Sequence, residues 1–218
     1  MTLHSVPAFF HPTRSSCRSV VYIGDSTSDG EISSNYMPDP RKRLAAQLAH
    51  VGVRTTYPEI QVARSIVETF HGQPNAQTVA RQHVSDGFHG CWVLALGTNE
   101  AADVAAGSSW GYANRIGRMM SVAHGQPVLW IDAVTLVRSG PYAESGMLRW
   151  NRALLGACSR YPNLRVFDWA SKAKPRWFIP DGIHYYSPGY VARSHDFAQA
   201  LMKAFPAGVV PSSVCIVH

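Results

Sequence analysis

The sequence predicts an α/β protein, a three-layer sandwich in which helices cover both faces of a five-stranded parallel β-sheet. Short apolar runs alternate about five times with stretches of helical periodicity. The runs are apolar at consecutive positions, which is typical of strands buried on both faces, and not at every second position. Strands that alternate with helices in this way form parallel sheets with helices packed on each side.

In the first half of the chain, three strands and two helices are predicted. Residues 19–23 form a continuous apolar run that ends at a glycine, as a buried strand does. The stretch 40–50 predicts a helix, because it starts with a proline and places Leu44 and Leu48 on one face. The other predicted elements are a strand at 53–62, a helix at 75–86 and a strand at 91–96.

The second half continues the same alternation. Its last helix is predicted at 187–204, where Pro188 falls in the first turn. Before it come a helix at 108–123, a strand at 128–134, a helix at 145–160 and a strand at 164–168. The ends of these strands are the places to look for function, because ligands of parallel sheets bind at the carboxyl ends of the strands.

The composition is that of one compact domain over residues 1–218. Hydrophobic residues make up 46% of the chain and charged residues 16%, which excludes a disordered protein. No apolar run approaches the ~20 residues that a membrane-spanning helix needs. We expect about 18 N-terminal residues and the C-terminal tail to extend from the domain.

A formal net charge of +6 favours weak attraction to acidic surfaces. The densest basic clusters lie at 41–43 and 172–176. Neither is interleaved with aromatic residues, as the groove of a single-strand-binding protein would be. We therefore expect no nucleic-acid partner. An anionic polymer of the cell envelope fits the positive charge at least as well as a nucleic acid does.

Residues 1–20 lack the charged start, the apolar stretch and the cleavage site of a signal peptide. We expect an exported or cell-envelope domain whose signal is left out of this chain, and a cytoplasmic protein is the alternative.

The four cysteines contain no Cys-x-x-Cys, and the histidines are scattered, so no metal site is predicted. Disulfides would indicate an oxidising compartment. We expect a bond between Cys17 and Cys215, which would tie both tails to the domain, and a second between Cys91 and Cys158; four free thiols are the alternative.

A glycine-bounded turn, Gly-Asp-Ser-Thr-Ser-Asp-Gly, follows the first predicted strand at residues 24–30. Ser26 then stands at a strand end near a helix N-terminus, a position that suits a nucleophile whose reaction creates negative charge. A phosphate-binding loop is the alternative. The glycine spacing matches neither of the common phosphate-binding motifs, and no lysine follows.

Two further groups follow later strands. Asn99 lies just after the third strand, where its amide could donate to a developing oxyanion, or could merely shape the turn or cap a helix. Asp181 precedes His184 by three residues, so the carboxylate can reach the imidazole, fix its tautomer and support the imidazolium. The alternative is a helix-capping Asp beside a surface His. Together the three groups supply a nucleophile, a base with its orienting acid, and an oxyanion donor.

These residues resemble the motifs of the SGNH hydrolase family. Tyr-Ile-Gly-Asp-Ser-Thr around Ser26 is similar to its first block, Gly-Thr-Asn-Glu around Asn99 to its Gly-x-Asn-Asp block, and Asp-Gly-Ile-His at 181–184 to its Asp-x-x-His block. The resemblance implies a flavodoxin-like strand order 2-1-3-4-5. It also implies esterase, deacetylase or acyltransferase chemistry on small acyl groups, often on carbohydrates, with no metal or organic cofactor.

The sequence departs from the family at two positions. Glu100 stands where the third block often has Asp. In the stretch 61–66 there is no glycine, although the family's second block supplies a glycine N–H to the oxyanion hole. The N–H of Ala63 or Arg64 can replace it, provided that the residue tolerates the backbone angles that glycine accepts freely. We expect Ser26, Asn99 and Ala63 to form the oxyanion hole.

Asp25, Arg64 and Trp177 are the candidates for substrate binding. Arg64 could meet an anionic substrate and Trp177 could wall the acyl pocket; a structural role is the alternative for both. The segments 33–39 and 135–144 are candidates for loops that determine specificity.

The resulting hypothesis is a serine esterase that hydrolyses small acyl esters, such as acetyl esters, on a carbohydrate or cell-envelope glycan. Two alternatives stay open. The same triad could pass the acyl group to a glycan hydroxyl, since exclusion of water by loops decides between hydrolysis and transfer. The domain could also be a carbohydrate-binding module that kept the fold without turnover.

Overall fold

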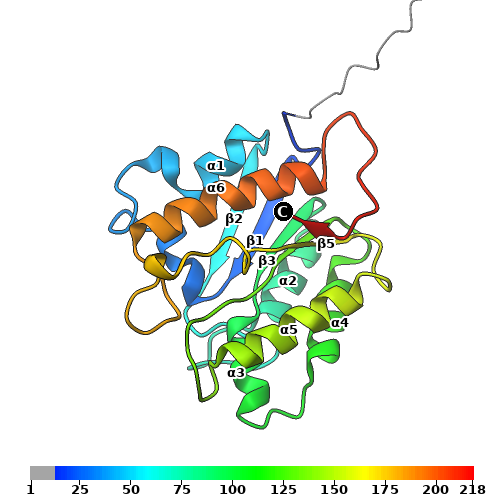
Figure 1. Ribbon diagram of the computed structural model, residues 1–218. Helices are drawn as coiled ribbons and strands as arrows, with labels where there is room; N and C mark the ends of the chain where they lie inside the picture. Colours follow the sequence, from blue (N-terminus) through cyan, green and yellow to red (C-terminus); the bar gives the residue numbers. More distant parts are fainter. Residues whose placement is uncertain (1–12) are drawn as a thin grey trace, which may run out of the picture.

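A computed structural model describes residues 13–218 and shows the predicted three-layer sandwich (Figure 1). The sheet has the strand order β2-β1-β3-β4-β5-β6, and all neighbours are parallel. The order of the first five strands agrees with the family resemblance, but the sheet has six strands and not five. The strands are β1 Ser19–Gly24, β2 Thr55–Ile60, β3 Cys91–Ala95, β4 Val128–Ile131, β5 Leu164–Phe167 and β6 Ile216–Val217.

Helices cover both faces of the sheet, α1 and α6 on one face and α2 to α5 on the other (Figure 1). Each face has its own buried core, with Phe197 of α6 in the first and Trp150 of α5 in the second. Among residues 13–218 no helix has the length and apolar character needed to cross a membrane. The helices are α1 Leu44–His50, α2 Ala76–Ser85, α3 Thr98–Ala105, α4 Tyr112–Ala123, α5 Glu144–Ala157 and α6 Ser187–Ala204; short 3-10 helices are η1 Ser26–Glu31, η2 Pro40–Lys42 and η3 Pro175–Trp177.

Most predicted elements are present, with shorter bounds. The predicted helix at 40–50 divides into η2 and α1, because Asp39 caps the proline turn at its start and Arg43 then takes an extended conformation. Helix α3 was not predicted. It has only eight residues, and its buried side includes Asn99 and Glu100 as well as alanines, so the apolar periodicity that marks a helix is weak there.

The terminal segments that the structure describes pack against the domain. The C-terminal tail is not a plain extension, because it adds β6 to the sheet beside β5. A strand of two residues has too short a pattern to be recognised in a sequence. Of the expected N-terminal extension, residues 1–12 lie outside the described part of the chain. Ser15, in contrast, donates its backbone N–H to Val51 and its hydroxyl to Phe205.

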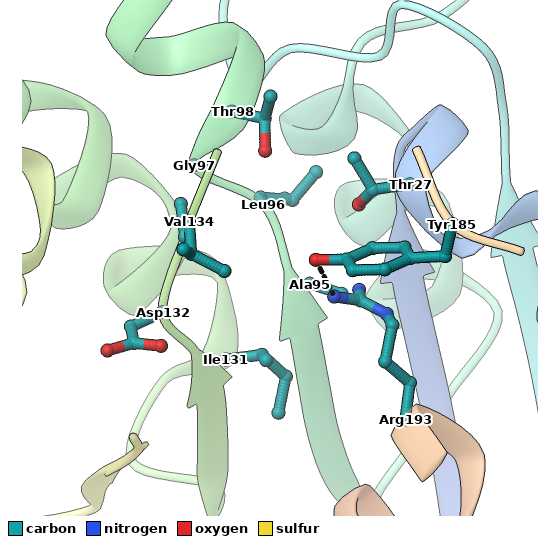
Figure 2. Close-up of a pocket in the computed structure, with 11 residues that line it drawn as sticks. Thr27, Ala95, Leu96, Gly97, Thr98, Ile131, Asp132, Val134, Tyr185 and Arg193 are labelled. Atoms are coloured by element: carbon teal, nitrogen blue, oxygen red, sulfur yellow. Dashed lines mark hydrogen bonds between the residues drawn. The ribbon is translucent and has the colours of Figure 1, made fainter. Parts of the chain in front are cut away.

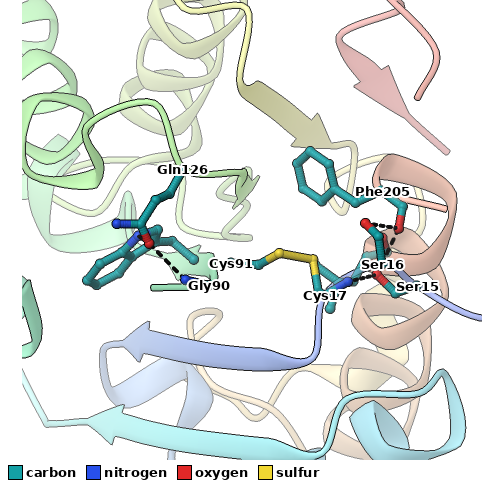
Figure 3. The surroundings of a disulfide bond; sticks show 9 residues. Ser15, Ser16, Cys17, Gly90, Cys91, Gln126 and Phe205 are labelled. Carbon is teal, nitrogen blue, oxygen red and sulfur yellow. Dashed lines mark hydrogen bonds between the residues drawn. A yellow bond between two sulfur atoms is a disulfide. The ribbon is translucent and has the colours of Figure 1, made fainter. Parts of the chain in front are cut away.

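Two disulfides are present, but the predicted pairing is wrong. Cys17 is bonded to Cys91 and Cys158 to Cys215. The first bond joins the segment before β1 to the start of β3, and these strands are neighbours in the sheet (Figure 3). The second joins the end of α5 to the residue before β6. Bonds of this kind follow from which strands are neighbours, and that order is not written in the cysteine spacing.

Candidate active site

The candidate residues come together at one edge of the sheet, where parallel strands all have their carboxyl ends. In the sheet Gly24 of β1 lies between Ile60 of β2 and Ala95 of β3. The segments that leave these three strands therefore start side by side. They carry Ser26, the stretch 61–66 and Asn99 respectively.

Ser26 is the first residue of η1, directly after β1. Asp25 caps this short helix, because its Oδ1 accepts from the backbone N–H of Thr27 at 2.8 Å and from the Thr27 hydroxyl at 2.7 Å. Asp25 is only 1% exposed. Burial raises the pKa of its carboxyl, against the hydrogen bonds from Thr27 that lower it. The cap fixes the turn and leaves the Ser26 side chain half-buried at the surface.

Ser26, His184 and Asp181 form a continuous hydrogen-bonded chain. His184 Nδ1 lies 2.7 Å from Asp181 Oδ2, and His184 Nε2 lies 2.8 Å from Ser26 Oγ. A carboxylate can only accept, so Nδ1 carries the proton and Nε2 is free to accept from the Ser26 hydroxyl. This is the geometry of a nucleophile beside a general base that is oriented by a third group.

Asp181 is held by the turn that it starts. Its Oδ1 accepts from the backbone N–H groups of Ile183 at 2.8 Å and His184 at 3.0 Å. Burial alone would raise the pKa of the Asp181 carboxyl, but these hydrogen bonds and the His184 ring lower it below its usual value. The carboxylate therefore stays ionised and can stabilise a protonated imidazole.

Asn99 lies in the first turn of α3 and is only 7% exposed. Its Nδ2 donates to the Arg64 carbonyl at 3.0 Å and lies 3.4 Å from Asp25 Oδ2. On the other side its Oδ1 accepts from the Tyr142 hydroxyl at 3.4 Å. These partners fix which way the amide points and tie it to the turn that carries Ser26.

Ala63 has the backbone conformation that the missing glycine would favour, with φ of +53°. The segment is placed beside the nucleophile turn because Gln61 donates its N–H to the Gly24 carbonyl at 3.2 Å. Within residues 13–218 neither the Ala63 N–H nor the Ser26 N–H makes a hydrogen bond. Both donors are therefore free for a ligand atom.

The three candidates for substrate binding lie outside the hydrogen-bonded chain of Ser26, His184 and Asp181. Asp25 is buried in the cap described above. The Arg64 side chain is buried, and its Nε and Nη1 have no partner in the described part of the chain. Burial lowers the pKa of its guanidinium, and the charge of Glu59, in the edge strand β2, acts in the opposite direction. Trp177 stacks on the buried Trp169 with ring centroids 5.8 Å apart, so its contacts are those of core packing.

A small pocket lies beside the site (Figure 2). Thr27 and Thr98, the neighbours of Ser26 and Asn99 in the sequence, line it together with Tyr185 and Arg193. Its volume of about 10 Å³ is close to that needed for one water molecule. Arg193, which lines this pocket, forms an ion pair with Glu31 at 2.9 Å, and both side chains are buried.

The sequence did not indicate the contacts of two residues near the oxyanion-hole candidates. Tyr142 reaches Asn99 from the segment 135–144, and the same segment bonds the triad turn, since Leu136 donates its N–H to the Gly182 carbonyl at 2.7 Å. Glu100, which departs from the family's third block, accepts the Ile66 N–H. No sequence signal marks these contacts, because they depend on how loops fold against α3.

No protein-family model matches the sequence, and no curated protein matches it. Solved structures do share its fold. A protein of Agrobacterium tumefaciens str. C58 assigned as an arylesterase has a TM-score of 0.65 at 18% identity, over 84% of this chain and 97% of that one. A carbohydrate acetylesterase family member from Sinorhizobium meliloti has 0.64 at 17% identity, over 85% and 99%.

The C-terminal catalytic domain of peptidoglycan O-acetyltransferase A from Streptococcus pneumoniae also matches, with a TM-score of 0.58 at 14% identity, over 84% of this chain and 89% of that domain. At these identities the likeness shows a common fold. Each of the three chains is covered over most of its length, so the likeness extends to the whole sandwich.

Proposed function

We propose that the chain is a serine hydrolase of the SGNH type, with Ser26 as nucleophile, His184 as general base and Asp181 as the acid that orients it. The observation that carries this proposal is the hydrogen-bonded chain from Ser26 Oγ through the His184 ring to Asp181 Oδ2. The motifs around these residues and the shared fold with esterases support it. A binding module without turnover would not need this chain of contacts.

The mechanism begins when His184 Nε2 takes the proton of the Ser26 hydroxyl while Ser26 Oγ attacks the ester carbonyl carbon. The carbonyl oxygen becomes an oxyanion, which accepts from the free N–H groups of Ser26 and Ala63. Asn99 Nδ2 is the third donor, and it exchanges its long 3.4 Å contact with Asp25 for the oxyanion. The intermediate then collapses, and the alcohol leaves with the proton from His184. A water molecule, deprotonated by His184, attacks the acyl-enzyme and releases the carboxylic acid and free Ser26.

As substrates we propose small acyl esters, such as acetyl esters, on a carbohydrate or cell-envelope glycan. Two proteins of the same fold are described as a carbohydrate acetylesterase family member and a peptidoglycan O-acetyltransferase. The basic residues at 172–176, which precede the triad turn, suit an anionic polymer. The two disulfides favour an oxidising, exported location.

Transfer of the acyl group to a glycan hydroxyl is the second candidate, and the likeness to an O-acetyltransferase domain favours it. The two reactions share the acyl-enzyme and differ in what attacks it. Turnover of an activated acetyl ester with and without an oligosaccharide acceptor separates them. A transferase gives an acetylated sugar in place of acetate, whereas a hydrolase gives acetate in both cases.

The proposed function is tested by the hydrolysis of p-nitrophenyl acetate by the parent chain and by Ser26→Ala. We expect the variant to lose ~10³-fold or more in kcat, as removal of a triad nucleophile does. Ser159→Ala is the matched control, because Ser159 is exposed after α5, at the opposite edge of the sheet. Equal activity of parent and Ser26→Ala, with both folded, would contradict the proposal.

A further inference from the structure

The segment 61–66 poses a problem of conformation. It offers the Ala63 N–H to the oxyanion hole, and Ala63 lies in the left-handed region with φ of +53°. An alanine is disfavoured there relative to glycine, because its Cβ crowds the neighbouring backbone. The fold must therefore hold this segment from outside if the N–H is to stay in place.

Helix α3 holds the segment at three successive residues. Asn99 Nδ2 donates to the carbonyl of Arg64 at 3.0 Å. The hydroxyl of Ser65 bonds the Asp103 carboxylate. Glu100 Oε1 accepts the backbone N–H of Ile66 at 2.7 Å.

Glu100 is the deepest of these anchors. Its side chain is fully buried, and its Oε2 has no partner within residues 13–218. Burial, with the nearby Asp25 charge, raises the pKa of its carboxyl to about 8. The side chain is then a neutral acid at pH 7, which glutamine mimics in size and in the ability to accept the Ile66 N–H.

We propose that Glu100 is a positioning residue for the oxyanion hole, holding the 64–66 backbone so that the Ala63 N–H faces the reacting carbonyl oxygen. The inference rests on the proposed function. The bond between Glu100 and Ile66 links the segment of Ala63 to α3, so the two positions at which the sequence departs from the family's motifs act together. The Glu100 side chain thus holds the segment in the left-handed backbone conformation that a glycine would adopt without strain.

The test is a set of variants in p-nitrophenyl acetate hydrolysis, each checked for folding by circular dichroism. Glu100→Leu removes the acceptor at nearly constant volume, and we expect kcat to fall roughly 10- to 100-fold, with KM within about two-fold of the parent, since the donor acts in the transition state. Glu100→Gln keeps the acceptor and is expected to stay within about three-fold of the parent.

The decisive variant adds Ala63→Gly to Glu100→Leu. Glycine removes the penalty on the left-handed conformation, so we expect this double variant to recover about five-fold in kcat. Ala63→Gly alone is measured beside the double variant as its reference, so that the recovery reports the coupling between the two positions. If Glu100→Leu does not fold, Glu100→Asp replaces it, since a shorter acid cannot reach the Ile66 N–H.

Three results would overturn the inference: full kcat in Glu100→Leu, a loss confined to KM, or no recovery on adding Ala63→Gly. Ser26→Ala, run beside the set, separates this inference from the proposed function. If Ser26→Ala is inactive and Glu100→Leu is fully active, only the role of Glu100 is wrong. If Ser26→Ala keeps its activity, the proposed function itself fails.

Discussion

Ser26 and His184 are 158 residues apart in the sequence, yet their side chains meet at 2.8 Å. At the scale of residues, this contact depends on two tight turns. Asp25 fixes one by capping η1, and Asp181 fixes the other through two backbone N–H groups. Each turn is thus built by a carboxylate within three residues of Ser26 or His184. Such local contacts leave a signature in the sequence, which is why the sequence could predict that Ser26, Asp181 and His184 lie together.

Tyr142→Phe tests a residue that the sequence did not indicate. The variant removes the hydroxyl that bonds Asn99 Oδ1 at 3.4 Å, and this long bond is worth little more than a weak neutral hydrogen bond. We expect a two- to five-fold lower kcat in p-nitrophenyl acetate hydrolysis and an unchanged KM, roughly the effect of ~0.5–1 kcal/mol.

Tyr57→Phe is the matched control, since Tyr57 is 41% exposed in the edge strand β2. An unchanged kcat in Tyr142→Phe, or the same loss in both variants, would show that the Tyr142 hydroxyl does not orient Asn99.

At the level of helices and strands, the sequence predicted the elements that have a clear hydrophobic pattern. It missed elements that are too short to show one and contacts that depend on the order of strands in the sheet. The long helices carry clear periodicity, and β1, β3 and β4 are continuous apolar runs. Helix α3 and strand β6 show neither pattern clearly, although α3 holds the segment 61–66 and β6 ends the sheet. The predicted disulfide pairing was wrong for a related reason. The observed pairing follows the order of strands in the sheet and not the positions of the cysteines in the chain.

Removing the bond between Cys158 and Cys215 should weaken the fold and leave the chemistry intact. The bond closes a loop of 57 residues, for which the chain-entropy model gives about 4 kcal/mol. We expect the double variant Cys158→Ala, Cys215→Ala to unfold at a lower denaturant concentration but to hydrolyse p-nitrophenyl acetate at the parent rate at 25 °C.

The reason for the unchanged rate is distance within the fold. Cys158 follows α5 at the amino edge of the sheet, and the triad lies at the carboxyl edge. A large loss of kcat in a folded double variant would mean that the C-terminal strand also supports the site.

At the scale of the whole molecule, acids are buried near the carboxyl edge of the sheet. Burial raises the pKa of Glu31 and of Asp132 to about 7, and the pKa of Glu100 to about 8. For Glu31, burial outweighs the charge and the hydrogen bond of Arg193, which lower its pKa. Asp181 stays ionised, but these three carboxyl groups bind protons more readily in the fold than in the unfolded chain, so the stability of the protein must depend on pH.

The direction of that dependence follows from the shifts. Glu100 titrates near 4.5 in ordinary surroundings and near 8 in the fold, so between these values the folded protein binds more protons than the unfolded chain. Its contribution to stability is complete below about pH 4.5 and is lost as the pH rises to about 8. We expect the melting temperature of the parent to fall between pH 5 and pH 9.

Glu100→Gln removes one of the titrating groups and should lessen this fall. At pH 9 the variant should melt several degrees higher than the parent, and at pH 5 it should melt at about the same temperature. Differential scanning calorimetry across this range provides the check. Parallel curves for parent and variant would show that Glu100 is not protonated in the folded protein at neutral pH.

The central claim, that Ser26 is an activated nucleophile, is tested most directly by labelling with a fluorophosphonate. Such a reagent phosphonylates a serine that a neighbouring base activates and leaves ordinary hydroxyls unmodified. We expect one label per chain by intact-mass spectrometry, located on the peptide that contains Ser26. Ser26→Ala should take no label, and His184→Ala should be labelled at a greatly reduced rate. A folded parent chain that takes no label, or takes it on another residue, would contradict the account.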